Sequence, residues 1–261
     1  MNFAVRGDRR IHWTSVGAGV PVVLVPGLGA GSKLFGTLPR RFARAGYFCV
    51  TLDPVGIAPS SEHQGEYSFP EAAADVIAVL DAAGITQATL VGTSLGGKVA
   101  TTCAAGHGPR VSRLVLLAAS ALVSPRARRV YRFFEILASR LSPEEIAETT
   151  APFLYGRTFH AEHDELVADI VRVLRPDARV RALMVAQARG LLSYDGELPA
   201  AIRCPTLCLG GAEDTLTPIE EVEATARAIT GARFVAIARA GHSLLLESEQ
   251  AFTEILGFLR A

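Results

Sequence analysis

The chain has 261 residues, and its 26 lysines and arginines balance 26 acidic residues, so it carries no formal net charge at neutral pH. A balanced charge provides no global field to attract nucleic acid or an anionic membrane surface. Hydrophobic residues make up 49% and charged residues 20% of the chain, which is enough apolar material for a large core and argues against disorder. We therefore expect one large α/β domain, or a core with an inserted subdomain.

The amino terminus and the cysteines favour a cytoplasmic protein. The first ten residues, MNFAVRGDRR, carry charges where a signal peptide has an apolar stretch, and no uncharged apolar run is long enough to span a membrane. The four cysteines lack the spacing of a zinc site and lie in apolar or helical segments, so we expect reduced, buried thiols and neither a metal nor a cofactor. They are Cys49, Cys103, Cys204 and Cys208.

Two short extended segments open the chain, and strands then alternate with helical patterns. Residues 3–7 and 10–16 flank a Gly-Asp turn that suits a hairpin. The later strands are expected at 22–26, 47–53, 88–92, 110–119, 204–211 and 233–239. The helices are expected at 34–46, 70–84, 94–108, 219–229 and 249–261. Continuous apolar strands that alternate with amphipathic helices predict a mainly parallel sheet covered on both faces.

Residues 120–199 show only helical patterns and form an insert longer than an ordinary connection between sheet elements. Within it, Ser142-Pro-Glu-Glu145 has the pattern of a capping box. We expect a core of 1–119 and 200–261 with a helical cap, a lid over a site, at 120–199. The apolar residues of the insert exceed what short helices need among themselves, which predicts that one face roofs an apolar pocket. They are Phe133, Phe134, Leu137, Leu154, Leu183 and Met184.

A glycine-rich loop follows the expected third strand, where residues 22–32 read VVLVPGLGAGS. Glycines let the backbone approach an anion, which can be a dinucleotide pyrophosphate or the oxyanion of an acyl-transfer reaction. Asp53, about twenty residues on, suits a ribose ligand in the dinucleotide interpretation. However, Ser32 stands where that fingerprint has Gly or Ala, and the interpretation leaves the motifs below unexplained.

The sequence GTSLGG at 92–97 contains G-x-S-x-G between an expected strand and an expected helix. In this context the pattern predicts a nucleophile elbow, a turn so tight that side chains at Gly92 and Gly96 would clash. Ser94 is therefore the candidate nucleophile. A nucleophilic serine also excludes the dehalogenases and epoxide hydrolases that attack through a carboxylate.

A serine hydroxyl needs a base, and one of six histidines has a suitable position. His242 falls in AGHS, after the last expected strand, at the sheet edge where open α/β folds place their sites. The other five lie on a hairpin, in loops or at a helix start, where we expect exposed, uncommitted side chains. They are His12, His63, His107, His160 and His163.

The base needs a carboxylate to orient it, and Asp214 in GAEDTLTP supplies one at the end of the preceding expected strand. The adjacent Glu213 is the local competitor, and we expect it to point elsewhere. Asp53 is a more distant rival, which is also suited to a structural turn before Pro54.

The order Ser, Asp, His on successive strand ends, with a helical insert between serine and acid, resembles the α/β-hydrolase superfamily. The segment IRCPTLCLGGAEDTLTP is similar to that of small esterases and 3-oxoadipate enol-lactone hydrolase-like proteins. The resemblance implies a mostly parallel sheet of about eight strands, helices on both faces and a helical cap. It also implies an oxyanion hole made by the backbone N–H groups of Leu28 and Leu95.

Two loops depart from the family pattern. The glycine loop begins Pro26-Gly27 where the family often has His-Gly, and DPVGIAPS has Val55 for an arginine and Ala58 for a glycine. A hole built from backbone amides tolerates the first change. The second change removes a charge near the site, so the substrate of similar enzymes cannot be assigned to this protein.

The expected function is a serine hydrolase that cleaves a carboxylic ester, lactone or thioester of a small molecule through an acyl-enzyme, with no nucleic-acid or membrane partner. The alternatives are a carbon–carbon bond hydrolase or lyase of the same fold and a non-hydrolytic small-molecule receptor. We expect the arginines of the insert to form a solvated face and three of its aromatic residues to pack in the core. The arginines are Arg126, Arg128, Arg129 and Arg132, and the aromatic residues are Phe153, Tyr155 and Tyr194.

Overall fold

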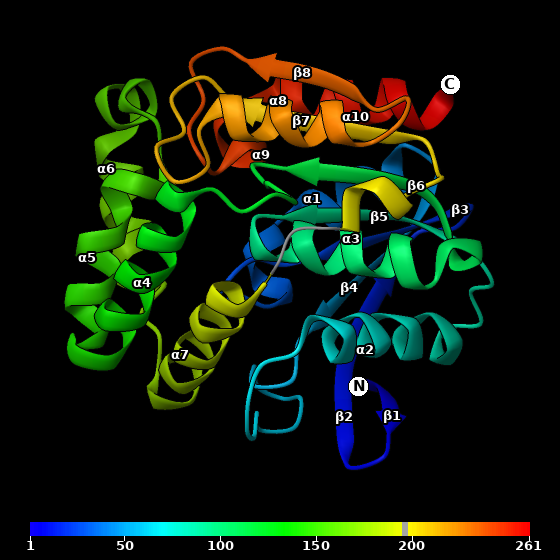
Figure 1. The fold of residues 1–261 in the computed structure, drawn as a ribbon, viewed down its shortest axis with the longest axis horizontal. Helices are drawn as coiled ribbons and strands as arrows, with labels where there is room; N and C mark the ends of the chain where they lie inside the picture. The colour runs from blue at the N-terminus through cyan, green and yellow to red at the C-terminus, as the bar shows by residue number, and fades with distance from the viewer. Residues whose placement is uncertain (195–197) are drawn as a thin grey trace.

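A computed structural model describes residues 1–194 and 198–261 of the chain (Figure 1). Within them lies an eight-stranded sheet in the order β1-β2-β4-β3-β5-β6-β7-β8. The β1–β2 and β2–β4 pairs are antiparallel and all other pairs are parallel, which confirms the predicted fold class. The strands are β1 Asn2–Arg6, β2 Arg9–Val16, β3 Val20–Val25, β4 Tyr47–Asp53, β5 Ala88–Thr93, β6 Val111–Leu117, β7 Thr206–Gly211 and β8 Arg233–Ile237.

Helices cover both faces of the sheet because the central strands are apolar on both sides. One buried cluster joins the sheet to α2 (Phe69–Ala82), α3 (Leu95–Gly106) and α8 (Ile219–Ala228). A second cluster, on the opposite face, joins it to α1 (Leu38–Arg44), α9 (Leu244–Glu247) and α10 (Glu249–Arg260). Short 3-10 turns occupy Gly108–Arg110 (η2) and Leu198–Ala201 (η3).

The predicted helix at 34–46 is divided in two. A 3-10 turn, η1, spans Ser32–Phe35, and α1 begins at Leu38. Gly36 between them has a φ of 47°, a left-handed conformation that ends the first turn, and Pro39 begins the second helix. The periodic apolar pattern continued across this break, so the pattern alone did not reveal it.

The described part of the connection from β6 to β7 contains four helices, which gather at the end of the sheet toward which the β6 and β8 arrows point (Figure 1). They are α4 Pro125–Arg140, α5 Pro143–Leu154, α6 Arg157–Val173 and α7 Ala178–Ser193. The predicted capping box is confirmed, because Glu145 N donates to Ser142 Oγ (3.1 Å) and Ser142 N donates to Glu145 Oε2 (2.8 Å). The limits of the cap, 120 and 199, remain a prediction, and residues 195–197 of that segment lie outside the described residues.

The strand order reverses at β3, which lies between β4 and β5. Connections on either side of such a point leave the sheet in opposite directions and open a crevice at the carboxyl ends of the strands. The glycine loop follows β3 and the Ser94 turn follows β5, so the two predicted segments meet at this crevice.

Candidate active site

The turn between β5 and α3 holds Ser94 in an unusual conformation, with φ 53° and ψ −119°. A non-glycine residue with positive φ is costly and is found mostly where the surrounding structure imposes it. A Cβ added at Gly92 would collide with Gly96 O, and one at Gly96 would collide with Val25 O. The geometry is that of the predicted nucleophile elbow.

Asp214 and His242 follow the neighbouring strands β7 and β8, and their side chains meet. His242 Nδ1 lies 2.8 Å from Asp214 Oδ2, and both side chains are buried. The other carboxylate oxygen, Asp214 Oδ1, accepts the backbone amides of Leu216 (2.8 Å) and Thr217 (2.9 Å). Because the carboxylate is held on both oxygens, it fixes the orientation of the imidazole and leaves Nε2 to act on another group.

The electrostatic surroundings of His242 favour its charged form. Burial lowers the pKa of His242, but the Asp214 carboxylate, through its charge and its hydrogen bond, and the charge of Glu247 raise it, and the net shift is upward from 6.5. A protonated His242 would therefore be stabilised. A general base needs this, because it becomes charged when it accepts a proton during the reaction.

Glu213, the adjacent competitor, faces the cap. Its carboxylate accepts Thr158 N (2.8 Å) and Thr158 Oγ1 (2.7 Å) and pairs with Arg157 (3.3 Å) in the first turn of α6. Burial raises the pKa of Glu213, and these contacts lower it further than burial raises it. Glu213 therefore holds α6 on the core. Its carboxylate contacts the cap, which agrees with the expectation that it does not point toward His242.

Glu247 was missed in the sequence, and it holds the loop that carries His242. Its carboxylate accepts the backbone amides of Gly241 (2.8 Å) and Ser243 (2.9 Å), on either side of the histidine. It also accepts Gly156 N from the cap (2.8 Å). Burial raises the pKa of Glu247. A glutamate five residues after a histidine is too common a spacing to indicate this role.

The glycine loop lies directly against the serine. A Cβ added at Gly27 would lie 3.5 Å from Ser94 Cβ. Gly27 O accepts Ala30 N (3.3 Å), so in the planar trans peptide the N–H of Leu28 points the opposite way, out of the turn. Leu95, the first residue of α3, carries one of the N–H groups that a helix start leaves without an intrahelical acceptor. The two predicted donors thus lie on segments that flank Ser94.

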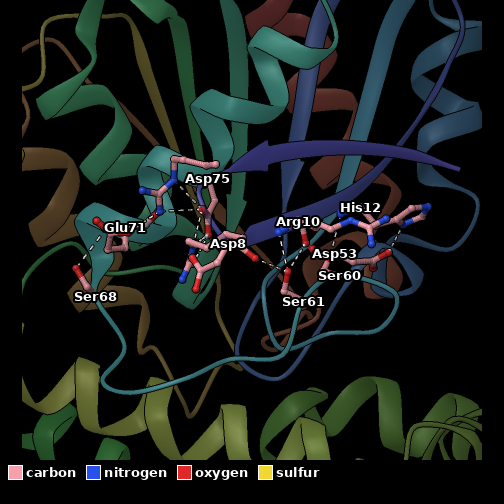
Figure 2. Close-up of polar contacts among 11 residues, drawn as sticks. Asp8, Arg10, His12, Asp53, Ser60, Ser61, Ser68, Glu71 and Asp75 are labelled. Atoms are coloured by element: carbon pink, nitrogen blue, oxygen red, sulfur yellow. Dashed lines mark hydrogen bonds and ion pairs between the residues drawn. The ribbon is translucent and has the colours of Figure 1, made fainter.

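Asp53 anchors the other end of the glycine loop. Its Oδ1 accepts Ser32 N (2.7 Å). Its Oδ2 lies 2.7 Å from His12 Nδ1, and its carbonyl accepts Ser60 Oγ (2.5 Å) (Figure 2). These contacts use both carboxylate oxygens, which suits the structural role and leaves the dinucleotide interpretation without its ribose ligand. Neither Asp53 nor its partner His12 contacts the Asp214–His242 pair in any hydrogen bond of the described residues.

The expectation that His12 is exposed and uncommitted is wrong. His12 is buried because β2 pairs with β4 in a register that places it opposite Asp53. The other non-candidate histidines are exposed or half-buried, and His63 and His160 contact the carbonyls of Gly65 and Ala151.

The arginines of α4 are exposed, as expected, and three of them have structural partners. Arg126 donates to the carbonyls of Thr215 and Leu216, next to Asp214. Arg128 donates to Leu192 O (2.6 Å), and Arg132 pairs with Glu135. The contacts of Arg126 and Arg128 fasten α4 to neighbouring segments, whereas the Arg132–Glu135 pair lies within α4.

Among the aromatic residues of the insert, Tyr155 and Tyr194 are buried, as expected. The expectation that Phe153 packs in the core is wrong, because it is 37% exposed and lies beside Phe133, which is 36% exposed. The two rings therefore contact each other between α4 and α5 and remain partly exposed.

The inner surface of the cap covers the glycine loop. Leu137 and Ile146 form a buried cluster with Met184, against which Leu28 packs. Leu183 is buried against the loop that follows β4, since a Cβ added at Gly56 would lie 2.8 Å from its side chain. The cap surface that packs on Leu28 of the glycine loop is therefore apolar.

A strained serine between β5 and α3, a buried Asp–His pair on β7 and β8, and a glycine loop after β3 define the α/β-hydrolase class of proteins. The family model for the alpha/beta hydrolase fold matches residues 20–249. The chain belongs to this family and is a hydrolase.

Three relatives illustrate the similarity. The chain is 27% identical to "Putative carbamate hydrolase RutD" of Azorhizobium caulinodans, with 99% of this chain and 98% of the relative covered. A thermophilic esterase from Thermogutta terrifontis is 27% identical, with a TM-score of 0.87 and coverage of 100% and 97%. The enol-lactonase from Burkholderia xenovorans shares the fold at 21% identity, with a TM-score of 0.89 and coverage of 99% and 100%. In residues 1–194 and 198–261, no helix has the length and apolar character required to cross a membrane.

Proposed function

We propose that the protein is a serine hydrolase that cleaves a carboxylic ester, lactone or thioester of a small molecule through an acyl-enzyme on Ser94. One observation carries the proposal: a buried hydrogen bond of 2.8 Å joins His242 to Asp214 at the same carboxyl edge of the sheet as the strained turn that holds Ser94. A hydroxyl is a weak nucleophile until a base removes its proton, and the strain at Ser94 is explained if the turn must present that hydroxyl.

In the proposed reaction, Ser94 Oγ attacks the substrate carbonyl carbon while His242 Nε2 accepts the hydroxyl proton. The amides of Leu28 and Leu95 stabilise the negative charge that develops on the carbonyl oxygen. Collapse of this intermediate breaks the bond to the alcohol or thiol, which leaves with the proton from His242. A water molecule, deprotonated by His242, then releases the acid and restores Ser94, while Asp214 remains ionised throughout.

The relatives and the cap indicate which substrates to test. One relative is named for carbamates and a solved relative is an esterase. The buried apolar cluster of Leu137, Ile146 and Met184 above the glycine loop favours an uncharged acyl group at this position. Esters, lactones, thioesters and carbamates with small apolar acyl groups therefore form the first panel.

A fluorophosphonate probe tests the nucleophile directly, because it forms a stable adduct with an activated serine. We expect one adduct per chain, on the peptide that contains Ser94. Ser94→Ala should abolish the adduct and reduce turnover on the order of a million-fold, the size of loss found for a serine-protease triad. An intact protein that takes no label, or a Ser94→Ala variant that keeps its activity on every substrate, would overturn the proposal and favour the receptor alternative.

A further inference from the structure

One face of α7 lies on the glycine loop. Val180, Met184 and Gln187 are spaced at i, i+4 and i+7, so they project from one side of the helix. A Cβ added at Gly29 would lie 2.6 Å from Met184 Cγ and 3.6 Å from Val180 Cγ1. Gly29 has a φ of 64°. Only glycine meets both demands, and the loop backbone is therefore pressed directly against the cap.

Gln187 makes the polar contact at this interface. Its Oε1 accepts Gly29 N at 2.8 Å, and the side chain is 1% exposed. A buried amide at this position costs free energy unless it is hydrogen-bonded, so the contact is specific.

The approach that makes this contact possible depends on Gly190, one turn further along α7. A Cβ added at Gly190 would lie 2.9 Å from both Cδ1 and the carbonyl oxygen of Tyr67. Helix α7 thus packs on the loop before α2 at Gly190 and on the glycine loop at Gln187.

The glycine loop depends on such external contacts. Its internal hydrogen bond, from Ala30 N to Gly27 O, is 3.3 Å long, beyond the usual range for a strong N–H···O bond. Asp53 holds Ser32 N at the far end. Between them, Gln187 holds Gly29, whose peptide is the next one after the peptide that carries Leu28 N–H.

We propose that Gln187 is a positioning residue, contributed by the cap, for the Leu28 donor of the oxyanion hole. By holding Gly29 N, it fixes the orientation of the adjoining peptide and so places the Leu28 N–H where the oxyanion forms. The inference rests on the proposed function. It assigns the cap a part in the chemistry in addition to covering the substrate, because movement of α7 away from the core would also release the glycine loop.

The test compares Gln187→Leu, which removes the acceptor at similar volume, with Gln187→Glu, which retains an acceptor oxygen. Loss of an oxyanion donor costs about 10²- to 10³-fold in kcat, and loosening one should cost less. With p-nitrophenyl butyrate, we expect kcat of Gln187→Leu to fall about 10- to 100-fold with KM within about threefold of wild type. Gln187→Glu should stay within about fivefold of the wild-type kcat. The inhibition constant of phenylboronic acid, which forms a tetrahedral adduct on serine, should rise with the same ranking.

Arg189→Met is the matched control, because Arg189 lies on the same helix and pairs with Glu135 of α4 (3.0 Å), not with the glycine loop. It should lower the melting temperature without changing kcat. All variants should be labelled completely by the fluorophosphonate at the end point of the reaction. Wild type that takes no label would contradict the proposed function, and this outcome is distinct from a failure of the present inference. If Gln187→Leu does not fold, Gln187→Asn, whose shorter side chain withdraws the acceptor, replaces it. A labelled Leu or Asn variant with wild-type kcat, or a Glu variant as impaired as Leu, would overturn the inference.

Discussion

Two adjacent carboxylates at the end of β7 face different parts of the molecule. Asp214 orients His242, while Glu213 holds the first turn of α6. The two residues follow one another in the turn after β7, where Asp214 N donates to Gly211 O (3.2 Å), so a single-residue step separates the proposed role in the reaction from a role in holding the cap.

This division predicts different outcomes for two similar substitutions. Asp214→Asn should reduce kcat by roughly ten-thousand-fold, because an amide holds the wrong imidazole tautomer against the serine. Glu213→Gln should reduce kcat far less and instead lower the melting temperature, because the amide replaces one of the oxygens that accept from Thr158. Steady-state kinetics and thermal unfolding measure both effects. Reversed effects would show that Glu213 is the acid.

Glu247 supplies a prediction about pH. His242 must be neutral to accept a proton, and the Glu247 charge is one of the influences that raise its pKa above 6.5. In wild type, kcat/KM should therefore fall as the pH decreases through a value above 6.5. Glu247→Gln should move this acidic limb to lower pH. Glu249→Gln removes an equal charge from an exposed position and should leave the limb in place. An unmoved limb in Glu247→Gln would contradict the assignment.

Among the elements, a buried lysine joins α3, the helix that follows Ser94, to the start of the cap. Lys98, on α3, donates to the carbonyls of Ser120 and Leu122, and its Nζ lies 4.6 Å from the centre of the Tyr194 ring. Burial lowers the pKa of Lys98 to about 7. Burial thus makes it costly in free energy to keep the Lys98 side chain protonated at the position where it donates to these two carbonyls.

The lowered pKa makes stability depend on pH in a definite direction. Between about pH 7 and 10 the unfolded chain holds the Lys98 proton more tightly than the folded chain, so Lys98 makes the free energy of unfolding rise with pH. We therefore compare the free energy of unfolding of Lys98→Met with that of wild type at each pH. This difference should favour the variant more at pH 7 than at pH 10, by a few kcal/mol, because one pKa unit corresponds to about 1.4 kcal/mol. Urea unfolding at the two pH values measures the difference. Lys33→Met, at an exposed lysine, should show none.

At the scale of the whole molecule, the cap is fastened to the core around the candidate site. Glu213 and Glu247 hold residues 156–158, Gln187 holds the glycine loop, and Lys98 holds the segment after β6. The buried residues Leu191 and Tyr194 also belong to the core cluster on the α2–α3 face. Removal of the cap should therefore affect both substrate selection and the chemical step.

A variant in which a Gly/Ser linker replaces residues 123–189 tests this expectation and leaves Leu191 and Tyr194 in place. We expect the core to fold, KM to rise and the ranking of the ester, lactone and thioester panel to change, since the apolar cover of the site is lost. We also expect kcat to fall about as far as in Gln187→Leu. Circular dichroism checks the fold. Unchanged selectivity across the panel would show that the cap does not determine specificity.

Local patterns in the sequence were sufficient for the sheet class and for the chain order of Ser94, Asp214 and His242. A strand of continuous apolar residues, a glycine-flanked serine and a capping box each depend on neighbours a few residues away, so their consequences can be deduced from sequence. The break at Gly36 and the burial of His12 could not, because the first depends on one backbone angle and the second on strand register.

The tertiary structure alone decided how the site is supported. Gln187 meets Gly29 across 158 residues of sequence, and Glu213 meets Thr158 across 55. Such contacts depend on where α6 and α7 lie on the core, and an isolated glutamine or glutamate on a helix or turn carries no mark of its partner. The sequence by itself determined the fold and the candidate reacting groups. The packing of the cap determined which amide, carboxylate and glycine hold those groups in place, because that packing is set by long-range burial and close backbone approach and not by local pattern.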